Sequence, residues 1–229
     1  MNTDLTTWIA EGDGSIAATP DGSYEMRVGT PYTLWHPEPV DGPACFSFRC
    51  SVLTPNSAML FFACARDWQG HAFFGDTRSG DYAEYNSGTL ESYTVGFNRA
   101  AHVTNDDQPN ASTANVRRLG GELSFGRFQP EQMRPNGELD LPVWREWNCH
   151  TNLASAREHA SGLDRFFHYE FVFYRPYIRL FVEGEELLTV IDHRPNPLAG
   201  GYFGIRNMTP GAHCRLKDFT VTPADDSRI

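Results

Sequence analysis

The chain has 229 residues, of which 40% are hydrophobic and 13% aromatic, and its formal net charge at pH 7 is −10. This composition is typical of a globular protein, and no apolar run approaches the roughly 20 residues of a membrane-spanning helix. A strongly negative protein repels nucleic acid and anionic membranes, because both are bound mainly through Lys and Arg. We therefore expect a soluble protein without nucleic-acid or membrane partners, in which any anionic ligand needs a local basic site.

Length and cysteine usage suggest one domain in a reducing compartment. A chain of this size suits a single domain covering residues 1–229. The opening MNTDLTTWIAEGDG lacks the basic and apolar regions of a secretory signal, which favours the cytoplasm. The five cysteines are an odd number, form no C-x-x-C pair and mostly have apolar neighbours. We expect reduced, buried thiols rather than a disulfide framework.

Strand patterns follow one another along nearly the whole chain. They are short, rich in aromatic and β-branched residues, and bounded by Gly, Pro, Asn or Asp. In chain order they are SYEMRV, YTLWH, ACFSFRCSVL, AMLFFACA, SYTVGFNR, HYEFVFYR, YIRLFVEG, ELLTVID, YFGIRNM and CRLKDFTVTP. The clearest pair is YIRLFVEGEELLTVID, where Glu183 and Gly184 supply a hairpin turn. No helical periodicity competes, so the sequence predicts an all-β, antiparallel two-sheet jelly-roll sandwich.

One segment departs from this pattern. Residues 119–165 are polar, with scattered Pro and Gly and a weak helical pattern at LASAREHA. Long irregular excursions from a compact sandwich usually carry function or are disordered, and Trp144, Trp147 and His150 argue against disorder because such aromatics normally pack. We interpret the segment as a long loop or insertion lying over one sheet.

The stretch GDYAEYNSGTLESYTVGFNRA gathers groups that could move protons or hold an anion. If DYAEYN is extended, Tyr82 and Glu84 share one side and Tyr85 faces the other. The following strand then has a small, polar Ser/Thr/Gly/Asn face that does not suit a core. Downstream, TANVRR projects Asn115 and Arg117 to the same side.

Near the C-terminus, GYFGIRNM sends Arg206 to the side opposite Phe203 and Ile205. This arginine therefore points away from the core.

The order of LWHPEP, MLFFACA, GDYAEYNSGTLESYTVGFNRA, TANVRR, FGIRNMTP and RLKDFTV resembles the YesU-like family. These are bacterial proteins of unassigned function found beside genes for using pectic rhamnogalacturonan. The likeness runs from about residue 32 to residue 221, and its part from 82 to 118 is the most specific. The resemblance implies a concanavalin A-like fold and, by association, a carbohydrate ligand. The positions that match the family by residue type are Trp35, Pro37, Glu38, Tyr82, Glu84, Tyr85, Ser87, Gly88, Arg99, Asn115, Arg117, Arg206, Met208 and Pro210.

Such a set suits a uronate-containing oligosaccharide of plant or microbial origin. Arginine and asparagine hydrogen bonds grip a uronate carboxylate, and their positive charge favours removal of the adjacent C5 proton. A nearby cation would lower the pKa of a tyrosine and let it act as the base. The hypothesis is β-elimination, a lyase reaction. Its candidate catalytic residues are Tyr82, Glu84 and Tyr85, and its candidate substrate-binding residues are Arg99, Asn115, Arg117, Arg206, Trp35 and Glu38.

Other interpretations stay open. A glycoside hydrolase needs two carboxyl groups across the glycosidic bond, which Glu84 with Asp76, Asp81 or Glu38 could supply, but the E-x-D-x-x-E strand pattern is absent. A binding module without turnover, or a partner subunit of other pectin-degrading proteins, fits the same fold, and a second copy of the chain is a further candidate partner. Residue type alone favours a core position for Trp35 and a turn-capping role for Glu38.

We expect no cofactor and no metal. NDDQPN, residues 105–110, offers oxygen ligands that could hold a structural calcium, but it lacks the ligand spacing and glycine of a dedicated loop. We therefore expect a solvated turn there. His36, His71 and His102 show no metal-ligand spacing.

Overall fold

The computed structural model of the chain describes residues 3–54, 57–75, 78–81, 84–85, 89–98, 113–119, 149–152, 164–192 and 197–224. These residues form strands almost throughout, with one short 3-10 helix at the start. The elements are η1 (Leu5–Thr7), β1 (Ile9–Ala18), β2 (Tyr24–Trp35), β3 (Val40–Asp41), β4 (Ala44–Val52), β5 (Ala58–Asp67), β6 (Leu90–Asn98), β7 (Thr113–Leu119), β8 (Cys149–Asn152), β9 (Phe166–Tyr174), β10 (Tyr177–Val182), β11 (Glu185–Ile191), β12 (Gly200–Asn207) and β13 (His213–Pro223).

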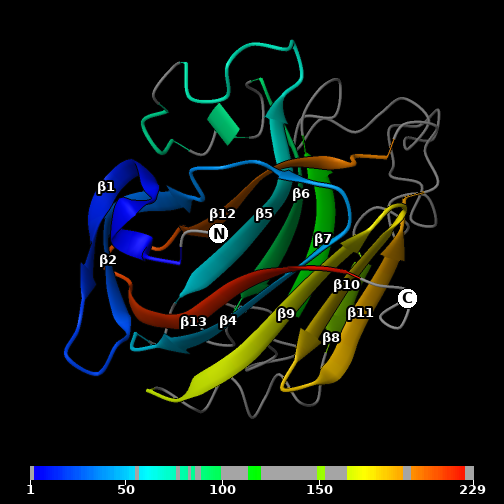
Figure 1. Cartoon of the computed structure of the whole chain (residues 1–229). Coiled ribbons are helices and arrows are strands. Elements are labelled where there is room, and N and C mark those ends of the chain that lie inside the picture. Colours follow the sequence, from blue (N-terminus) through cyan, green and yellow to red (C-terminus); the bar gives the residue numbers. More distant parts are fainter. Residues whose placement is uncertain are drawn as a thin grey trace, which may run out of the picture.

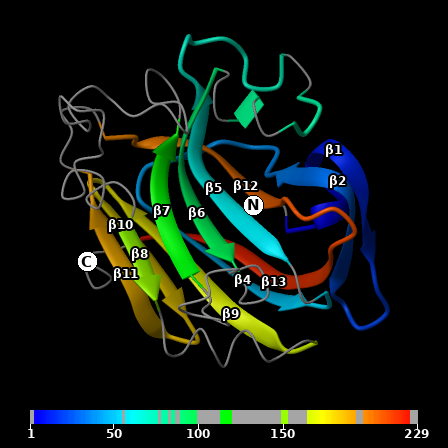
Figure 2. The same cartoon turned by 180° about the vertical axis from the view of Figure 1, so that it is seen from behind.

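The strands form a continuous antiparallel sheet that folds back on itself. Its order is β11-β10-β9-β4-β13-β2-β12-β5-β6-β7-β8, with β1 added to β2 and β3 to β12. We call β11, β10, β9, β4 and β13 layer A, which lies in front in Figure 1. We call β12, β5, β6, β7 and β8 layer B, which comes to the front in the reverse view of Figure 2. The two packed layers confirm the antiparallel β-sandwich predicted from the sequence.

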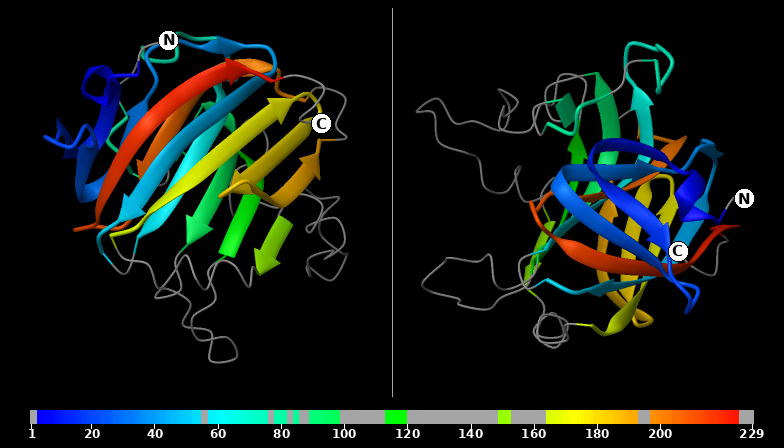
Figure 3. Two further views of the ribbon diagram at one scale, coloured as in Figure 1. Left: turned by 60° about the horizontal axis from the view of Figure 1, so that its bottom comes forward. Right: turned by 90° about the vertical axis from the view of Figure 1, so that its left-hand side faces the viewer.

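Strand β2 joins the two layers. Its residues 24–27 pair with β13 of layer A, whereas its residues 32–35 pair with β12 of layer B. The β1–β2 hairpin therefore stands at one side of the sandwich, as Figure 3 shows from that side. A strand that passes from one layer to the other is a common way to turn the corner of a sandwich.

Aromatic side chains from both layers fill the space between them. Phe46 of β4 stacks on Phe203 of β12 with ring centroids 4.2 Å apart, and Phe48 meets Phe61 of β5 at 4.9 Å. Burial alternates along the strands, most regularly in β10. This is the period-two pattern expected of strands with one face on a core.

The hairpin predicted at Glu183 and Gly184 is present. These residues separate β10 from β11 and have φ angles of 52° and 81°, as a two-residue turn with two left-handed positions requires. The SYEMRV and YTLWH patterns belong to one long strand, β2. The sequence patterns missed β1, β3 and β8.

Strand β8 falls inside the segment 119–165, which we interpreted as a long loop over one sheet. Its four residues pair with β7 and so extend layer B at its edge. The rest of that segment lies outside the described residues, apart from its two ends.

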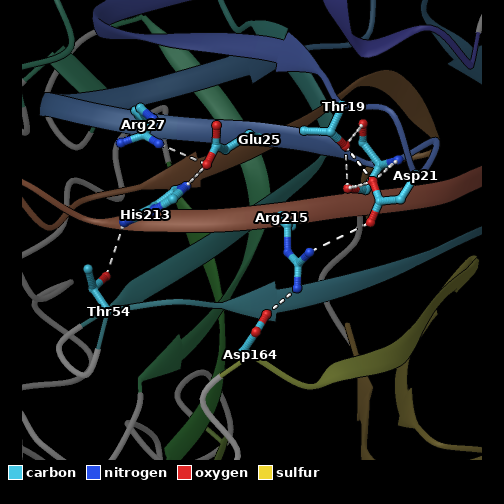
Figure 4. Close-up of polar contacts among 9 residues, drawn as sticks. Thr19, Asp21, Glu25, Arg27, Thr54, Asp164, His213 and Arg215 are labelled. Atoms are coloured by element: carbon cyan, nitrogen blue, oxygen red, sulfur yellow. Dashed lines mark hydrogen bonds and ion pairs between the residues drawn. The ribbon is translucent and has the colours of Figure 1, made fainter.

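The outer face of layer A carries a polar network where β2 meets β13. Glu25 of β2 accepts a hydrogen bond from Arg27 and forms an ion pair with His213 of β13, as Figure 4 shows. Arg215, also on β13, pairs with Asp164, two residues before β9, and with Asp21 in the turn before β2. These contacts tie the turn before β2 and the residue that precedes β9 to the same strand.

The side chains of four of the five cysteines are described, and all four are buried and outside any disulfide, namely Cys45, Cys50, Cys64 and Cys214. This confirms the expectation of buried thiols for those positions. Burial raises the pKa of the Cys64 thiol to about 12, so this group stays protonated and unreactive at neutral pH. In the described part of the chain, no helix has the length and apolar character needed to span a bilayer.

Candidate functional site

The strand register gives Arg206, Asn115 and Arg117 positions on the outer face of layer B, turned away from layer A. Directly opposed residues of antiparallel strands share a face, so the strand register defines the rows that cross it. One row is Glu11, Thr33, Arg206, Leu60, Gly96, Asn115 and His150. The next row is Ile9, Trp35, Gly204, Phe62, Thr94 and Arg117.

In the register, Asn115 and Arg117 occupy positions in the same two rows as Arg206 and Gly204. The residues do not form one tight cluster, however. Arg206 is on β12 and Asn115 on β7, three strands away, which corresponds to about 14 Å at the usual strand spacing. Ser92 and Thr94 of β6 lie between them and are buried. The small polar face predicted for β6 is thus present at these two residues.

A buried carboxylate, Glu11, occupies the β1 end of the first row. One of its oxygens, Oε2, accepts hydrogen bonds from Trp35 Nε1 at 2.7 Å, Arg78 Nε at 2.9 Å and the Tyr85 hydroxyl at 2.6 Å. The other, Oε1, pairs with Arg78 Nη2 at 2.7 Å. Glu11 is only 3% exposed, so its charge is balanced by Arg78 within the protein.

Arg206 lies next to this group and is 1% exposed. Its guanidinium donates to Thr33 Oγ1 at 2.9 Å and to the Gly80 carbonyl at 2.7 Å. Its central carbon lies 3.9 Å from the centre of the Tyr85 ring, which is a cation–π contact. The side predicted for Arg206 is confirmed, but the residue is covered by the connection between β5 and β6.

That connection is held in shape by its own polar groups. Glu84 Oε2 accepts hydrogen bonds from the backbone N–H of Ser79 at 2.8 Å and from the Ser79 hydroxyl at 3.0 Å. The Glu84 N–H in turn donates to the Asp81 carbonyl at 3.2 Å. The described residues between Arg78 and Tyr85 therefore close on themselves, and Glu84 stabilises the turn.

Two glycines let the backbone of this connection rest directly on the β1–β2 hairpin. Gly80 has a φ of 92°, and a Cβ there would lie 2.5 Å from the Pro31 carbonyl and 2.6 Å from the Gly12 Cα. Gly12 itself lies in a register shift of β1, between its pairing with Tyr32 and the next pair. A bulge of this kind bends a strand and re-aims neighbouring side chains, here Glu11.

Burial shifts the pKa of two members of this group. It raises the pKa of the Tyr85 phenol, and the neighbouring Glu11 carboxylate raises it further. Burial also lowers the pKa of the Arg206 guanidinium, although Tyr85 and Glu11 act in the opposite direction. We expected a cation to lower the pKa of a site tyrosine, and for Tyr85 the direction is the opposite because burial outweighs Arg206.

At Glu84 and Tyr85 the backbone differs from the extended strand expected there. Glu84 and Tyr85 lie in a helical turn, so the alternation that placed Tyr85 opposite Glu84 does not apply. Tyr82 lies outside the described residues, as does Arg99. The calcium-like stretch 105–110 lies outside them as well.

Trp35 and Glu38 were expected to contact a ligand. Trp35 is fully buried, and its indole lies against Gly204, where a Cβ would come within 2.4 Å of the ring. Glu38 is exposed, and its backbone N–H and carbonyl both contact His36 Nδ1. Trp35 is therefore a buried residue that donates a hydrogen bond to Glu11, and Glu38 belongs to a turn.

Sequence reasoning missed Glu11 and Arg78. Arg78 lies over the Phe73 ring, with its central carbon 4.5 Å from the ring centre, and forms the charge pair with Glu11. The available signal was EGDG at residues 11–14, since a carboxylate next to glycines within a strand suggests a bulge. The described residues contain no group of three or more His, Cys, Asp or Glu side chains arranged to hold a metal ion.

Solved structures with the same architecture include several lectin-like proteins. A protein of unknown function with a galectin-like fold from Bacillus subtilis superposes with a TM-score of 0.69 at 21% identity, covering 96% of this chain and 90% of that one. A legume lectin-like domain from Entamoeba histolytica gives a TM-score of 0.59 at 10% identity, covering 95% and 90%. The carbohydrate-binding module CBM66 from Bacillus subtilis gives 0.54 at 10% identity, covering 95% and 96%. At these identities the likeness establishes the lectin-like, concanavalin A-like fold.

A comparison with curated proteins finds no match. A family model does match, over residues 1–124, which include Glu11, Arg78 and Tyr85 and extend through β7. The chain therefore belongs to the family described as Domain of unknown function (DUF1961).

Proposed function

We propose that the protein binds carbohydrate on the outer face of layer B. Two features support this. The architecture is the one that lectin-like and carbohydrate-binding proteins use, as the similar structures illustrate. The face also carries the buried polar residues Thr33, Arg206 and Thr94, beside the apolar Trp35 and Phe62.

The ligand class that fits best is an acidic, uronate-containing oligosaccharide. The observation that carries this proposal is the strand register, in which Asn115 and Arg117 follow Gly96 and Thr94 across the face. An arginine next to an amide suits a carboxylate, because the guanidinium donates two parallel hydrogen bonds. In a chain of net charge −10, such a local site is needed to hold an anion. Pectic uronates are the first candidates, because of the resemblance described above.

Binding accounts for the described residues better than turnover does. Both oxygens of Glu11 already accept hydrogen bonds, which leaves little capacity for taking a substrate proton. Tyr85 donates its hydroxyl to Glu11, and its raised pKa keeps the phenol protonated at neutral pH. Glu11 and Tyr85 therefore have a structural role on this face and do not form an acid/base pair ready for catalysis.

β-Elimination is the second candidate function. It is favoured by the position of the β5–β6 connection, which is bonded to Arg206 and Glu11 and carries Tyr82 within it. In this version Tyr82 takes the C5 proton, and Asn115 and Arg117 hold the uronate carboxylate. A glycoside hydrolase would need two carboxyl groups across the bond, and the engaged oxygens of Glu11 make it a poor member of such a pair.

The buried cysteine thiols support a reducing compartment. Cys45, Cys50, Cys64 and Cys214 form no disulfide. Disulfides persist mainly in oxidising compartments, so this pattern suits the cytoplasm. We therefore propose a cytoplasmic location.

The test is calorimetric titration of the purified protein with a panel of uronate trisaccharides and their uncharged methyl esters. The proposal expects binding of at least one free acid and much weaker binding of its ester. Arg117→Ala should weaken binding by roughly 10- to 100-fold, since a hydrogen bond to a charged group contributes about 1.5–3 kcal/mol. Arg49→Ala is the matched control, because Arg49 lies on layer A and pairs with Asp218.

The same samples separate the candidate functions. An ultraviolet chromophore from an unsaturated uronate would indicate a lyase, and new reducing ends without it would indicate a hydrolase. Unchanged affinity in Arg117→Ala would remove the proposed carboxylate site. Absence of binding to every sugar would contradict the proposed function itself.

A further inference from the structure

We propose that Glu11 is a positioning residue that fixes the β5–β6 connection over the carbohydrate-binding face without touching the ligand. This inference rests on the proposed function. It concerns the described residues 78–81, 84 and 85, which we call the 78–85 segment. The buried Glu11 carboxylate holds both ends of this segment.

The contacts of Glu11 are distributed in a particular way. Arg78 at the start of the segment and Tyr85 at its end both bond to Oε2, and Arg78 also reaches Oε1. Trp35 bonds to the same oxygen from β2. Three parts of the chain thus meet on one side chain that is 3% exposed. Losing the charge of Glu11 would leave the Arg78 guanidinium, whose side chain is 14% exposed, without its carboxylate partner, which is costly.

The middle of the segment is fixed by a second set of contacts. The Gly80 carbonyl accepts from Arg206, and the Gly80 Cα region packs against Gly12 and Pro31 with no space for a side chain. Glu84 closes the segment onto Ser79. The segment is therefore a preformed unit, and its placement on layer B depends on the hydrogen bonds to Glu11 and Arg206.

Placement matters because the segment lies over one end of the face. Its residues cover Arg206 and the β1–β2 end of the rows, and the rows continue over β6 and β7 towards Asn115 and Arg117. Tyr82 belongs to the same connection. A shift of the 78–85 segment would change the surface that it presents beside the proposed ligand. Displacements of about 1 Å are enough to weaken a preorganised site.

The chain offers a matched control for Glu11. Glu91 of β6 is also buried, at 8% exposure, and also pairs with an arginine, since Arg66 donates to its Oε2 from both Nε and Nη2 at 2.8 Å. Arg66 of β5, the described partner of Glu91, lies outside the 78–85 segment. Glu11→Gln and Glu91→Gln remove the same charge, and only the first should move the segment. The Arg66 side chain is 51% exposed and that of Arg78 is 14% exposed, so solvent screens the Glu91 pair more strongly. Tyr85→Phe is a milder second variant that removes one hydroxyl.

The experiment measures thermal unfolding, the affinity for the tightest uronate trisaccharide, and amide hydrogen exchange at Ser79 and Glu84. For Glu11→Gln we expect an affinity at least 10-fold weaker and exchange at both amides at least 10-fold faster at 25 °C. Tyr85→Phe should change both readouts in the same direction by a smaller factor. For Glu91→Gln we expect a smaller loss of thermal stability and an affinity within about 2-fold of the wild type.

Equal affinity losses in Glu11→Gln and Glu91→Gln would overturn the inference, because the loss would then not depend on contacts with the 78–85 segment. Unchanged exchange at Ser79 and Glu84 in Glu11→Gln would overturn it as well. If the wild type binds no uronate, the proposed function fails. Exchange at Ser79 and Glu84 in Glu11→Gln then still decides whether Glu11 holds the segment in place. A Glu11→Gln protein that does not fold leaves Tyr85→Phe to decide, by the same two readouts.

Discussion

At the scale of single residues, the site depends on how buried charges are satisfied. Glu11 and Arg78 compensate each other, whereas Arg206 relies on neutral acceptors and on the face of the Tyr85 ring. Burial shifts the pKa of Tyr85 upward and that of Arg206 downward, so in both cases burial disfavours the charged form. Tyr85 consequently acts as a hydrogen-bond donor to Glu11.

The raised pKa of Tyr85 makes a prediction for alkaline solution. Above about pH 10, the ordinary pKa of tyrosine, the unfolded chain loses this proton while the folded protein retains it, so stability falls as pH rises. Tyr85→Phe lacks this group and should lose less stability between pH 8 and pH 11 than the wild type. Urea unfolding at both pH values measures the difference. Equal losses in the two proteins would show that Tyr85 titrates normally.

Residue-scale features were only partly predictable from the sequence. Arg206 could be assigned to the outer face from the alternation around Phe203 and Ile205, since that pattern is local. Glu11 could not be linked to its partners, because Arg78 and Tyr85 are 67 and 74 positions away in the chain. The same distance explains why the pKa direction of Tyr85 was wrong, since it depends on burial by segments that no local pattern identifies.

At the scale of elements, a bulge in β1 and a glycine in the β5–β6 connection allow two backbones to pack directly. Gly12 and Gly80 face each other at the hairpin, next to Glu11. The sequence missed β1 because EGDG is poor in the residues typical of strands. It placed Tyr85 wrongly because the alternation expected of a strand does not apply in a helical turn.

A pair of glycine substitutions tests this packing. Gly80→Ala combines a left-handed φ with a Cβ 2.5 Å from the Pro31 carbonyl, and should lower the free energy of unfolding by about 3 kcal/mol. Gly22 has a similar φ of 80° but nothing within 4 Å of its Cβ position, so Gly22→Ala should cost about 1 kcal/mol. Chemical denaturation of both variants supplies the comparison. A Gly80→Ala protein as stable as Gly22→Ala would mean that the two backbones are not in contact.

Asp21, in the polar network between β2 and its neighbours, should make stability depend on pH in acid solution (Figure 4). Hydrogen bonds from Thr19 and then from Ser23 hold the pKa of Asp21 well below its ordinary value. Its contribution to stability is therefore present above about pH 4 and is lost as pH falls below that. Asp21→Asn should show a smaller drop in melting temperature between pH 6 and pH 2.5 than the wild type. Parallel drops would indicate that Asp21 is not engaged in the folded protein.

At the scale of the whole molecule, the antiparallel sandwich was predictable because period-two alternation directly reports which strand faces are buried. Ser92 and Thr94 confirm the polar face expected of β6, and the buried Tyr93 and Val95 confirm the opposite one. The edge strand β8 was not predictable, since four residues are too few for a pattern to emerge. Which face of which layer binds a ligand depends on how the sheet folds through β2, and that is a property of the complete molecule.

Chemical-shift mapping by NMR tests the central claim most directly. The claim is that the outer face of layer B binds the sugar, and the measurement is titration of the ¹⁵N-labelled protein with the tightest uronate trisaccharide. We predict shifts centred on Thr94, Gly96, Asn115 and Arg117, with none at Arg49, His168 and Lys217, which share a row across layer A. Shifts centred on layer A, with layer B unchanged, would contradict the account.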